Sequence, residues 1–263
     1  MPRYTRDEYV AIINDFYTFL TRMHIADSAL EHPPDEGWRN ITPEKCSGFG
    51  KTAFVIDLLK HLPYIQGGME NDVDIHYKCN VVDYSALTPE DFGSAWIKYG
   101  EIAASASADG PVPVPVPAHT VVLARGHESG GRDLLLDTER GSVIEEAIRF
   151  QRCGEWDVAE YFEELRRKYE ALEMFHIPGT ETVQWMEHGY DEKEMAAAAA
   201  THAQAPLREG EFFPTEEDVR WVRYLYKSYG WPRPEFRRDE CLEAIARYKA
   251  MREGVGKEEE EEE

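Results

Sequence analysis

Residues 119–149 read HTVVLARGHESGGRDLLLDTERGSVIEEAIR, and this stretch decides the fold because it predicts three successive strands. Thr120 to Arg125 is rich in β-branched residues, and the glycines of GHESGGR supply a turn before the apolar run Leu134 to Leu136. A second turn, DTERG, ends at Gly141, after which Val143 begins the third run. The stretch therefore predicts a β-meander at the centre of a sheet.

Amphipathic spacing predicts helices on both sides of this meander. The segment 5–25 begins with a capping box made by Thr5 and Glu8 and continues with apolar residues at helical spacing. Apolar stripes of the same kind predict helices over 53–62 and 157–175. These helices are expected to cover the sheet.

The segments between these elements carry weaker patterns. Thr42 and Pro43 predict the start of a short helix, and Thr88 predicts the cap of another. Residues 75–84 alternate apolar and polar side chains, which predicts one strand with Cys79 in the core. Alternating prolines in 103–118 predict an exposed insertion in a polyproline conformation.

The C-terminal part predicts a helical hairpin over 211–254, with Thr215 as the cap of its first helix. The chain is thus expected to be α+β, a largely antiparallel sheet covered by helices, with this hairpin docked on the sheet domain. The expected domain map is a sheet domain, a linker, the hairpin and an acidic tail, at 1–180, 181–210, 211–254 and 255–263. The segments expected to be mobile, because they lack a periodic apolar face, are 103–117, 190–208 and 256–263.

Charge and cysteine usage exclude several classes of function. The chain has 29 Lys and Arg against 51 Asp and Glu, a net charge of −22, which disfavours binding to nucleic acid and to anionic membranes. Its four cysteines lie far apart without a CxxC pair, so free thiols are expected. The N-terminal MPRYTRDEY has no apolar signal region. These features are typical of a monomeric protein of the cytoplasm or nucleus.

One motif resembles the end of a phosphate-binding loop. Gly50, Lys51 and Thr52 match its last three positions, but Lys45 stands where the motif needs its first glycine, and no hydrophobic strand leads in. We therefore expect a turn that caps the next helix rather than a nucleotide site.

A second candidate is a polar group in and beside the first turn of the meander. His119, His127, Glu128 and Asp133 have the composition of a hydrolytic metal site or a general acid and base set. Their spacing matches no metal motif, so a solvated turn is the preferred interpretation, with no metal, cofactor or catalytic residue assigned. An ordinary cross-strand ion pair is expected between Asp137 and Arg125 or Arg132.

The stretch VVLARGHESGGRDLLLDTERGSVIEEAIRF, followed by WDVAEYFEELRRKYE, resembles the SMI1/KNR4 family, also called the SUKH superfamily. The residues that carry the resemblance are Gly130, Gly131, Asp137, Gly141, Val143, Trp156, Phe162 and Leu165. It covers about residues 5–178. The resemblance implies a single α+β domain without cofactor or reaction, which in fungal members takes part in cell-wall and stress signalling and in bacterial members neutralises toxins.

These observations lead to the expectation of a non-catalytic protein that binds a protein partner. The aromatic residues proposed for that surface are Trp156, Trp221, Tyr224 and Trp231. The alternative left open is a small-molecule or metal-dependent enzyme that uses the loop of His127, Glu128 and Asp133.

Overall fold

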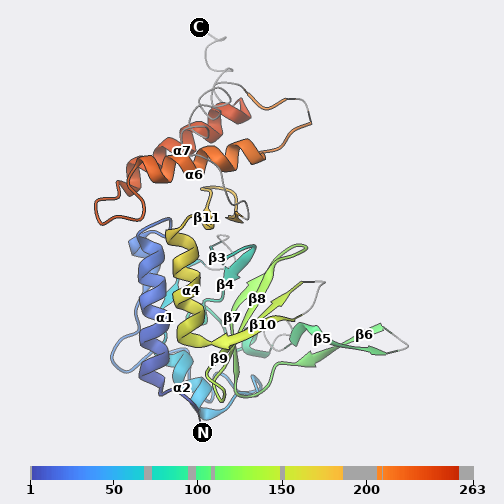
Figure 1. Cartoon of the computed structure of the whole chain (residues 1–263). Coiled ribbons are helices and arrows are strands. Elements are labelled where there is room, and N and C mark those ends of the chain that lie inside the picture. The colour runs from blue at the N-terminus through green and yellow to red at the C-terminus, as the bar shows by residue number, and fades with distance from the viewer. Residues whose placement is uncertain are drawn as a thin grey trace. The chain divides into compact units, whose positions relative to one another are not determined.

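The structure is a computed structural model of the whole chain (Figure 1). It describes residues 2–67, 73–93, 99–107, 110–148, 152–185, 206–208 and 210–254. The chain forms two compact units, Met1–Arg166 and Arg167–Glu263, which are described one at a time.

A six-stranded antiparallel sheet is the centre of the first unit. Its strands, in spatial order, are β10 (Arg152–Asp157), β9 (Ser142–Ala147), β8 (Arg132–Asp137), β7 (Thr120–Gly126), β4 (Cys79–Val81) and β3 (Asp74–His76). Strands β7, β8 and β9 confirm the predicted meander, with Leu136 opposite both Val121 and Val143. The α+β class is therefore confirmed.

Glycine and aspartate make the two turns of the meander. Gly131 lies so close to the backbone of His127 and Lys78 that a Cβ at this position would overlap both. In the second turn, Asp137 Oδ1 accepts hydrogen bonds from the N–H groups of Glu139 and Arg140, at 2.9 and 3.0 Å. Both turns hold the strands in register where the sequence predicted them.

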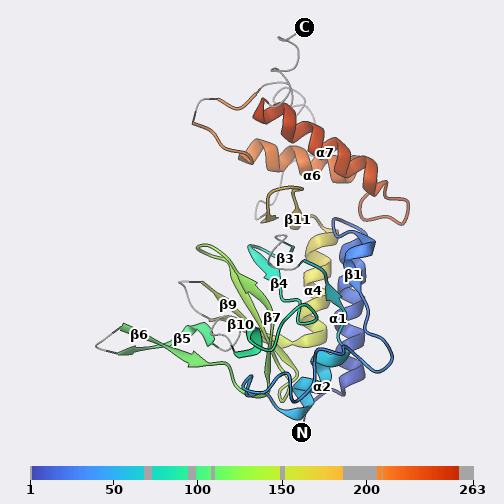
Figure 2. The ribbon, with the colours of Figure 1, turned by 180° about the vertical axis from the view of Figure 1, so that it is seen from behind.

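Helices cover one face of the sheet. Helix α1 (Arg6–Thr21) begins with the predicted capping box of Thr5 and Glu8. Figures 1 and 2 show α1 and α4 (Val158–Glu170) side by side, and their rings of Phe16 and Phe162 lie 5.0 Å apart. Helix α2 (Ala53–His61) is the predicted third helix, and Thr52 caps it. The apolar stripes seen in the sequence are thus the buried faces.

An aromatic cluster packs against β7. Tyr84 is buried and donates a hydrogen bond from its hydroxyl to the carbonyl oxygen of Val122 in β7, at 2.9 Å. Phe49, Tyr64 and Phe92 surround the Tyr84 ring at centroid distances of 6.1, 6.1 and 6.4 Å. Consecutive residues of the central strands β7 and β8 are buried, so these two strands are covered on both faces.

Two predictions about short elements were wrong. Residues 75–84 form the hairpin β3–β4 rather than one strand, and Lys78 has a φ of 46° in the turn. No glycine marks this turn, so the alternating pattern concealed it. Thr42 accepts a hydrogen bond on its side chain from the N–H of Lys45, but the chain makes only a turn there and no helix.

The prolines were also misinterpreted. Within the described residues, η2 (Asp91–Gly93) follows Thr88, and β5 (Tyr99–Ser107) pairs with β6 (Gly110–Pro115) as a separate two-stranded ribbon. Because proline occupies every second position of β6, the valines between the prolines can still donate N–H groups to a partner strand. This ribbon replaces the expected polyproline segment, and the part of the expected helix at 94–98 lies outside the described residues.

The region around α4 differs from the prediction at both ends. Strand β10 precedes the helix, because the polar sequence RCGEWD pairs along β9 despite its weak strand pattern. The helix ends at Glu170 rather than near 175, and Leu172 has a φ of 54°. Strand β11 (Met174–His176) follows at once.

The second unit is a helical hairpin on a small strand pair. Strand β11 pairs with β12 (Thr182–Gln184), which lies where a linker was expected. Helices α6 (Glu216–Ser228) and α7 (Arg238–Glu253) confirm the hairpin, and the Tyr226 hydroxyl donates to the carbonyl of His176 at 2.8 Å. Docking of the hairpin on the sheet domain stays a prediction. Much of the expected linker, at 186–205, and the acidic tail lie outside the described residues.

Small elements complete the first unit: η1 (Asp27–Ala29), β1 (Leu30–Glu31) and β2 (Tyr64–Ile65), of which the two strands pair with each other. None of the helices within the described ranges is long and apolar enough to cross a bilayer.

Candidate functional site

The predicted polar site is not one site, because its histidines lie at opposite ends of β7. His119 directly precedes this seven-residue strand and His127 directly follows it. A strand rises about 3.3 Å per residue, so the two positions are separated by roughly 20 Å or more. The structure therefore corrects the grouping of His119 with the turn.

The other three members of that group have different partners. His127 Nε2 lies 3.2 Å from Oδ1 of the buried Asp74, whereas Glu128 pairs with Lys78 at 2.8 Å. Asp133 is 2 % exposed and turns inward to Arg125. Within the described ranges, no three His, Cys, Asp or Glu residues are placed to hold a metal ion.

The buried ion pair also differs from the expected one. Arg125 Nη1 lies 2.7 Å from Asp133 Oδ2 because the register of β7 and β8 places these residues next to each other. Asp137 lies at the far end of β8, opposite Thr120, and caps the second turn instead. Arg132 pairs with Glu145 at 2.8 Å.

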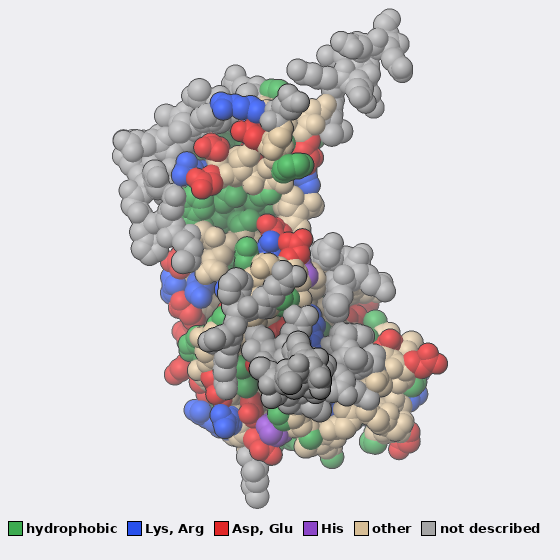
Figure 3. Space-filling model, turned by 90° about the vertical axis from the view of Figure 1, so that its right-hand side faces the viewer, with side chains coloured by type: hydrophobic (Ala, Val, Ile, Leu, Met, Phe, Trp, Pro, Cys, Tyr) green, Lys and Arg blue, Asp and Glu red, His purple; other side chains and the backbone are tan. Residues whose placement is uncertain are grey.

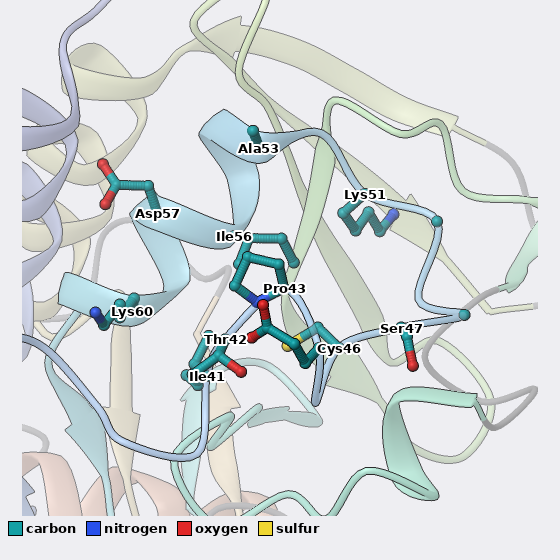
Figure 4. Close-up of a pocket in the computed structure, with 13 residues that line it drawn as sticks. Ile41, Thr42, Pro43, Cys46, Ser47, Lys51, Ala53, Ile56, Asp57 and Lys60 are labelled. Carbon is teal, nitrogen blue, oxygen red and sulfur yellow. The ribbon is translucent and has the colours of Figure 1, made fainter.

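A pocket of about 740 Å³ lies between the loop 41–51 and helix α2. In Figure 4, Ile56, Pro43 and Cys46 lie at its centre, with Lys51 at one end and Asp57 at the other. The volume is within the range of small-molecule pockets. Both lysines and carboxylates line the pocket, so its charge does not indicate a class of ligand.

Lys51 is a structural residue of this loop. Its Nζ donates to the carbonyl oxygens of Val116 and Pro117, at 3.3 and 3.0 Å, and the N–H of Thr52 donates to Ala118. Burial, with a smaller contribution from the charge of Arg125, lowers the pKa of Lys51 to about 8. The GFGKT motif therefore ties the start of α2 to the chain before β7, as a turn that caps the helix.

Lys51 should make stability rise with pH between 8 and 9.5. Its folded pKa of about 8 lies below its ordinary 10.5, so the unfolded chain binds more protons in this window. We expect a gain of about 1–2 kcal/mol in the free energy of unfolding, measured by urea denaturation. Lys51→Met should lose this rise, whereas Lys45→Met, at an exposed lysine, should keep it. Equal slopes for Lys51→Met and the unaltered protein would contradict the assignment.

Strand β10 is the second candidate, because it ends the sheet and is exposed. No further strand pairs with its outer side in the described part of the chain. Trp156 is 41 % exposed, and its ring lies 5.7 Å from that of Tyr161 in α4. The indole also lies against Gly154, where any Cβ would collide with it. The indole is therefore held by these neighbours while part of it stays exposed.

The backbone direction of β10 shows which N–H groups point outward. The N–H of Val158 donates to Gly141 O at 3.0 Å, so it points toward the turn that begins β9. Alternate residues of a strand point their backbone groups to the same side, so the N–H groups of Trp156 and Gly154 also face β9. The N–H of Glu155 then faces away from the sheet. The sequence analysis did not identify this edge, and the spacing Gly-x-Trp at 154–156 is the signal that could have indicated it.

The other predicted aromatic residues are less accessible than expected. Trp231 is 4 % exposed and donates from Nε1 to the carbonyl of Tyr169 at 2.8 Å, which corrects its assignment to a partner surface. Trp221 and Tyr224 are half-buried and stack at 5.2 Å. Phe212, which the sequence did not single out, is 85 % exposed.

Figure 3 shows how the charged side chains are distributed on one face. In Figure 3, the Lys and Arg side chains of the described residues that face the viewer stand singly or in small groups beside Asp and Glu. A phosphate backbone is bound by clustered basic groups, and this face does not present such a cluster among its described residues.

No protein-family model, curated protein or solved structure matches the chain.

Proposed function

We propose that this chain is a non-catalytic protein-interaction protein that binds its partner at the outer edge of β10. The observation that carries the proposal is the exposed end strand of the sheet with Trp156 half-exposed upon it. A strand at the end of a sheet is a position at which another chain can add in an extended conformation. The partner would add a seventh strand next to β10.

Trp156 is suited to anchor such a strand. Large aromatic residues at the centre of an interface contribute most of the binding free energy. Contact with Gly154 and Tyr161 fixes the indole before the partner arrives, so little side-chain entropy is lost on binding. β10 contains no proline, and its irregularity is confined to the register shift between Arg152 and Gly154.

The polar candidates support an enzyme less well. Asp133 neutralises Arg125 in the interior, and His119 lies at the other end of β7 from His127. The pair of His127 and Asp74 contacts the surface only through His127, whose side chain is 35 % exposed. The enzyme alternative would therefore have to rest on this single pair.

The cellular role that we propose rests only on the resemblance to the SMI1/KNR4 family. Fungal members of that family are interaction hubs in cell-wall and stress signalling. A regulatory role of that kind, in the cytoplasm or nucleus, is what the resemblance supports for this chain.

Capture experiments with edge variants test the proposal. The full chain is immobilised, and proteins retained from its native lysate are quantified for the unaltered chain, Trp156→Ala and Glu155→Pro. Glu155→Pro removes an outward N–H without removing one that faces β9. We expect at least one protein to bind about thirtyfold less to both variants, as for loss of about 2 kcal/mol at an anchor.

Two controls separate the edge from other surfaces. Phe212→Ala removes an aromatic side chain of the second unit that is the most exposed among the described residues, and this variant should retain every captured protein. Glu155→Thr keeps the backbone N–H and should retain them as well. If Trp156→Ala and Glu155→Pro, folded by circular dichroism, capture the same proteins in the same amounts, the proposal is wrong.

A further inference from the structure

We propose that the pocket between the loop 41–51 and helix α2 binds a small amphipathic carboxylate, with its charged end at Lys51 and its apolar part over Pro43 and Ile56. Only residues of 41–60 line this pocket, so the site is separate from the edge of β10 and does not depend on the proposed function. The proposal is carried by the apolar centre of the pocket and by the way in which its charged residues are paired.

The centre of the pocket is apolar. Figure 4 shows Pro43, Cys46 and Ile56 close together there, and Ile41 and Ala53 also belong to the lining. Cys46 and Ile56 are 5 % and 8 % exposed, so the pocket reaches side chains that are largely shielded from solvent. A pocket of about 740 Å³ with such a centre favours a ligand whose body is a ring or a short alkyl chain.

The charged residues of the lining differ in their partners. Asp57 is exposed and pairs with Arg6 at 3.4 Å, and the exposed carboxylate of Glu44 accepts hydrogen bonds within its own turn. Lys51 and Lys60 are half-buried, and neither forms an ion pair with a carboxylate of the described residues. The lining contains both signs of charge, but its half-buried charges are positive and lack a counter-charge in the described part of the chain.

Lys51 has the geometry to receive a carboxylate. An ammonium carries three N–H donors, and Lys51 directs two of them to the carbonyl oxygens of Val116 and Pro117. These carbonyl groups replace water without supplying a negative charge, and burial, followed by the charge of Arg125, lowers the pKa of Lys51 to about 8. A ligand carboxylate would accept the third hydrogen bond and supply the counter-charge, so that bond would be charge-assisted.

The surroundings favour a ligand with a single negative charge. Glu44 and Asp57 border the same pocket, and the chain carries a net charge of −22. A doubly charged phosphate would therefore meet more repulsion than a carboxylate, and the one remaining donor of Lys51 compensates a single charge better than two. The same net charge attracts cations to the protein in general, so a preference for an anion requires a local site.

Three ligands with one phenylalkyl body test the proposal by isothermal titration calorimetry on the full chain. They are 4-phenylbutyrate, 4-phenylbutyramide and 4-phenylbutylamine, whose head groups are negative, neutral and positive. We expect 4-phenylbutyrate to bind about tenfold tighter than the amide and the amine to bind most weakly. Inorganic phosphate should not compete with 4-phenylbutyrate. Nonspecific attraction to an acidic protein would give the reverse order, and that result would overturn the proposal.

Variants place the ligand in the pocket. Lys51→Met should weaken 4-phenylbutyrate about tenfold and leave the amide unchanged, because only the carboxylate gains from the ammonium. Ala53→Trp fills the pocket from the exposed first residue of α2, keeps Lys51, and should abolish binding of all three ligands. Lys45→Met is the matched control, since this exposed lysine of the same loop does not line the pocket, and it should change neither affinity.

Ala53→Trp keeps the site testable if Lys51→Met is found unfolded by circular dichroism. Binding of 4-phenylbutyrate that survives Ala53→Trp would overturn the site. Equal affinities of 4-phenylbutyrate and the amide would overturn the carboxylate as the ligand class. Loss of 4-phenylbutyrate binding in Lys60→Met, but not in a folded Lys51→Met, would overturn the position of the charged end. Failure of 4-phenylbutyrate to bind at millimolar concentration would overturn the whole proposal.

Discussion

Replacing Asp218 by alanine should destabilise the helical hairpin by about 4 kcal/mol. This carboxylate is fully buried and accepts hydrogen bonds from the N–H and hydroxyl of Thr215, both at 2.9 Å. Its Oδ1 also accepts from Nε of Arg252 at 2.7 Å and from the Tyr248 hydroxyl. Removal would take away the buried carboxylate that pairs with the guanidinium of Arg252.

Hydrogen exchange, followed by mass spectrometry on peptides from α6 and α7, measures this effect within the second unit. Thr215→Ala removes only the cap and should cost about 1 kcal/mol. Asp239→Asn is the matched control, because its carboxylate is 90 % exposed in the first turn of α7. Protection in Asp218→Ala equal to that in Asp239→Asn would contradict the prediction.

Acid should have the same effect as the substitution. Burial alone would raise the pKa of Asp218, but hydrogen bonds from Tyr248, Thr215 and Arg252 outweigh it and hold the pKa below its ordinary value of 3.8. The stabilisation is therefore present above about pH 4 and is lost as the pH falls through the lower folded pKa. Exchange in α6 and α7 should accelerate only in that acidic range.

The sequence predicted the elements whose boundaries are set by local chemistry. The turns at Gly131 and Gly141 and the caps at Thr5 and Thr215 all satisfy backbone groups within a few residues. All the residues that form such a turn or cap lie within a short stretch of the sequence. For this reason the meander, α1 and the hairpin were found.

Elements that depend on distant partners were missed. Strand β10 is polar and forms because β9 offers it a ladder, and the turn at Lys78 takes a positive φ without a glycine. The buried pair of Asp218 and Arg252 was missed for the same reason. The position of Asp218 three residues after Thr215 indicated only helix capping, and Arg252 lies 34 residues after Asp218 in the sequence. The candidate edge at Trp156 became visible only once β10 was placed as the last strand of the sheet.

Asp133→Asn should destabilise the first unit by about 3–5 kcal/mol. The side chain of Asp133 is almost the same size as asparagine, so the change removes charge rather than volume. Its oxygens accept from Arg125 Nη1 at 2.7 Å and from the N–H of Gly126 at 2.8 Å, and both residues of the pair are buried. The main cost is the loss of the carboxylate charge that pairs with the buried Arg125 between β7 and β8.

A double replacement separates this structural role from a catalytic one. Arg125→Met combined with Asp133→Leu substitutes an apolar pair for the ion pair, and buried pairs replaced in this way are often neutral in stability. We expect the double variant to recover most of the loss, measured by urea denaturation with exchange in β7 and β8 as a local readout. Glu128→Gln, in the same turn but with a 68 % exposed side chain, should change stability by less than about 1 kcal/mol.

If the single and double variants are equally unstable, Asp133 stabilises the sheet through contacts other than Arg125. Full stability of Asp133→Asn would instead return Asp133 to the functional candidates of the His127 loop.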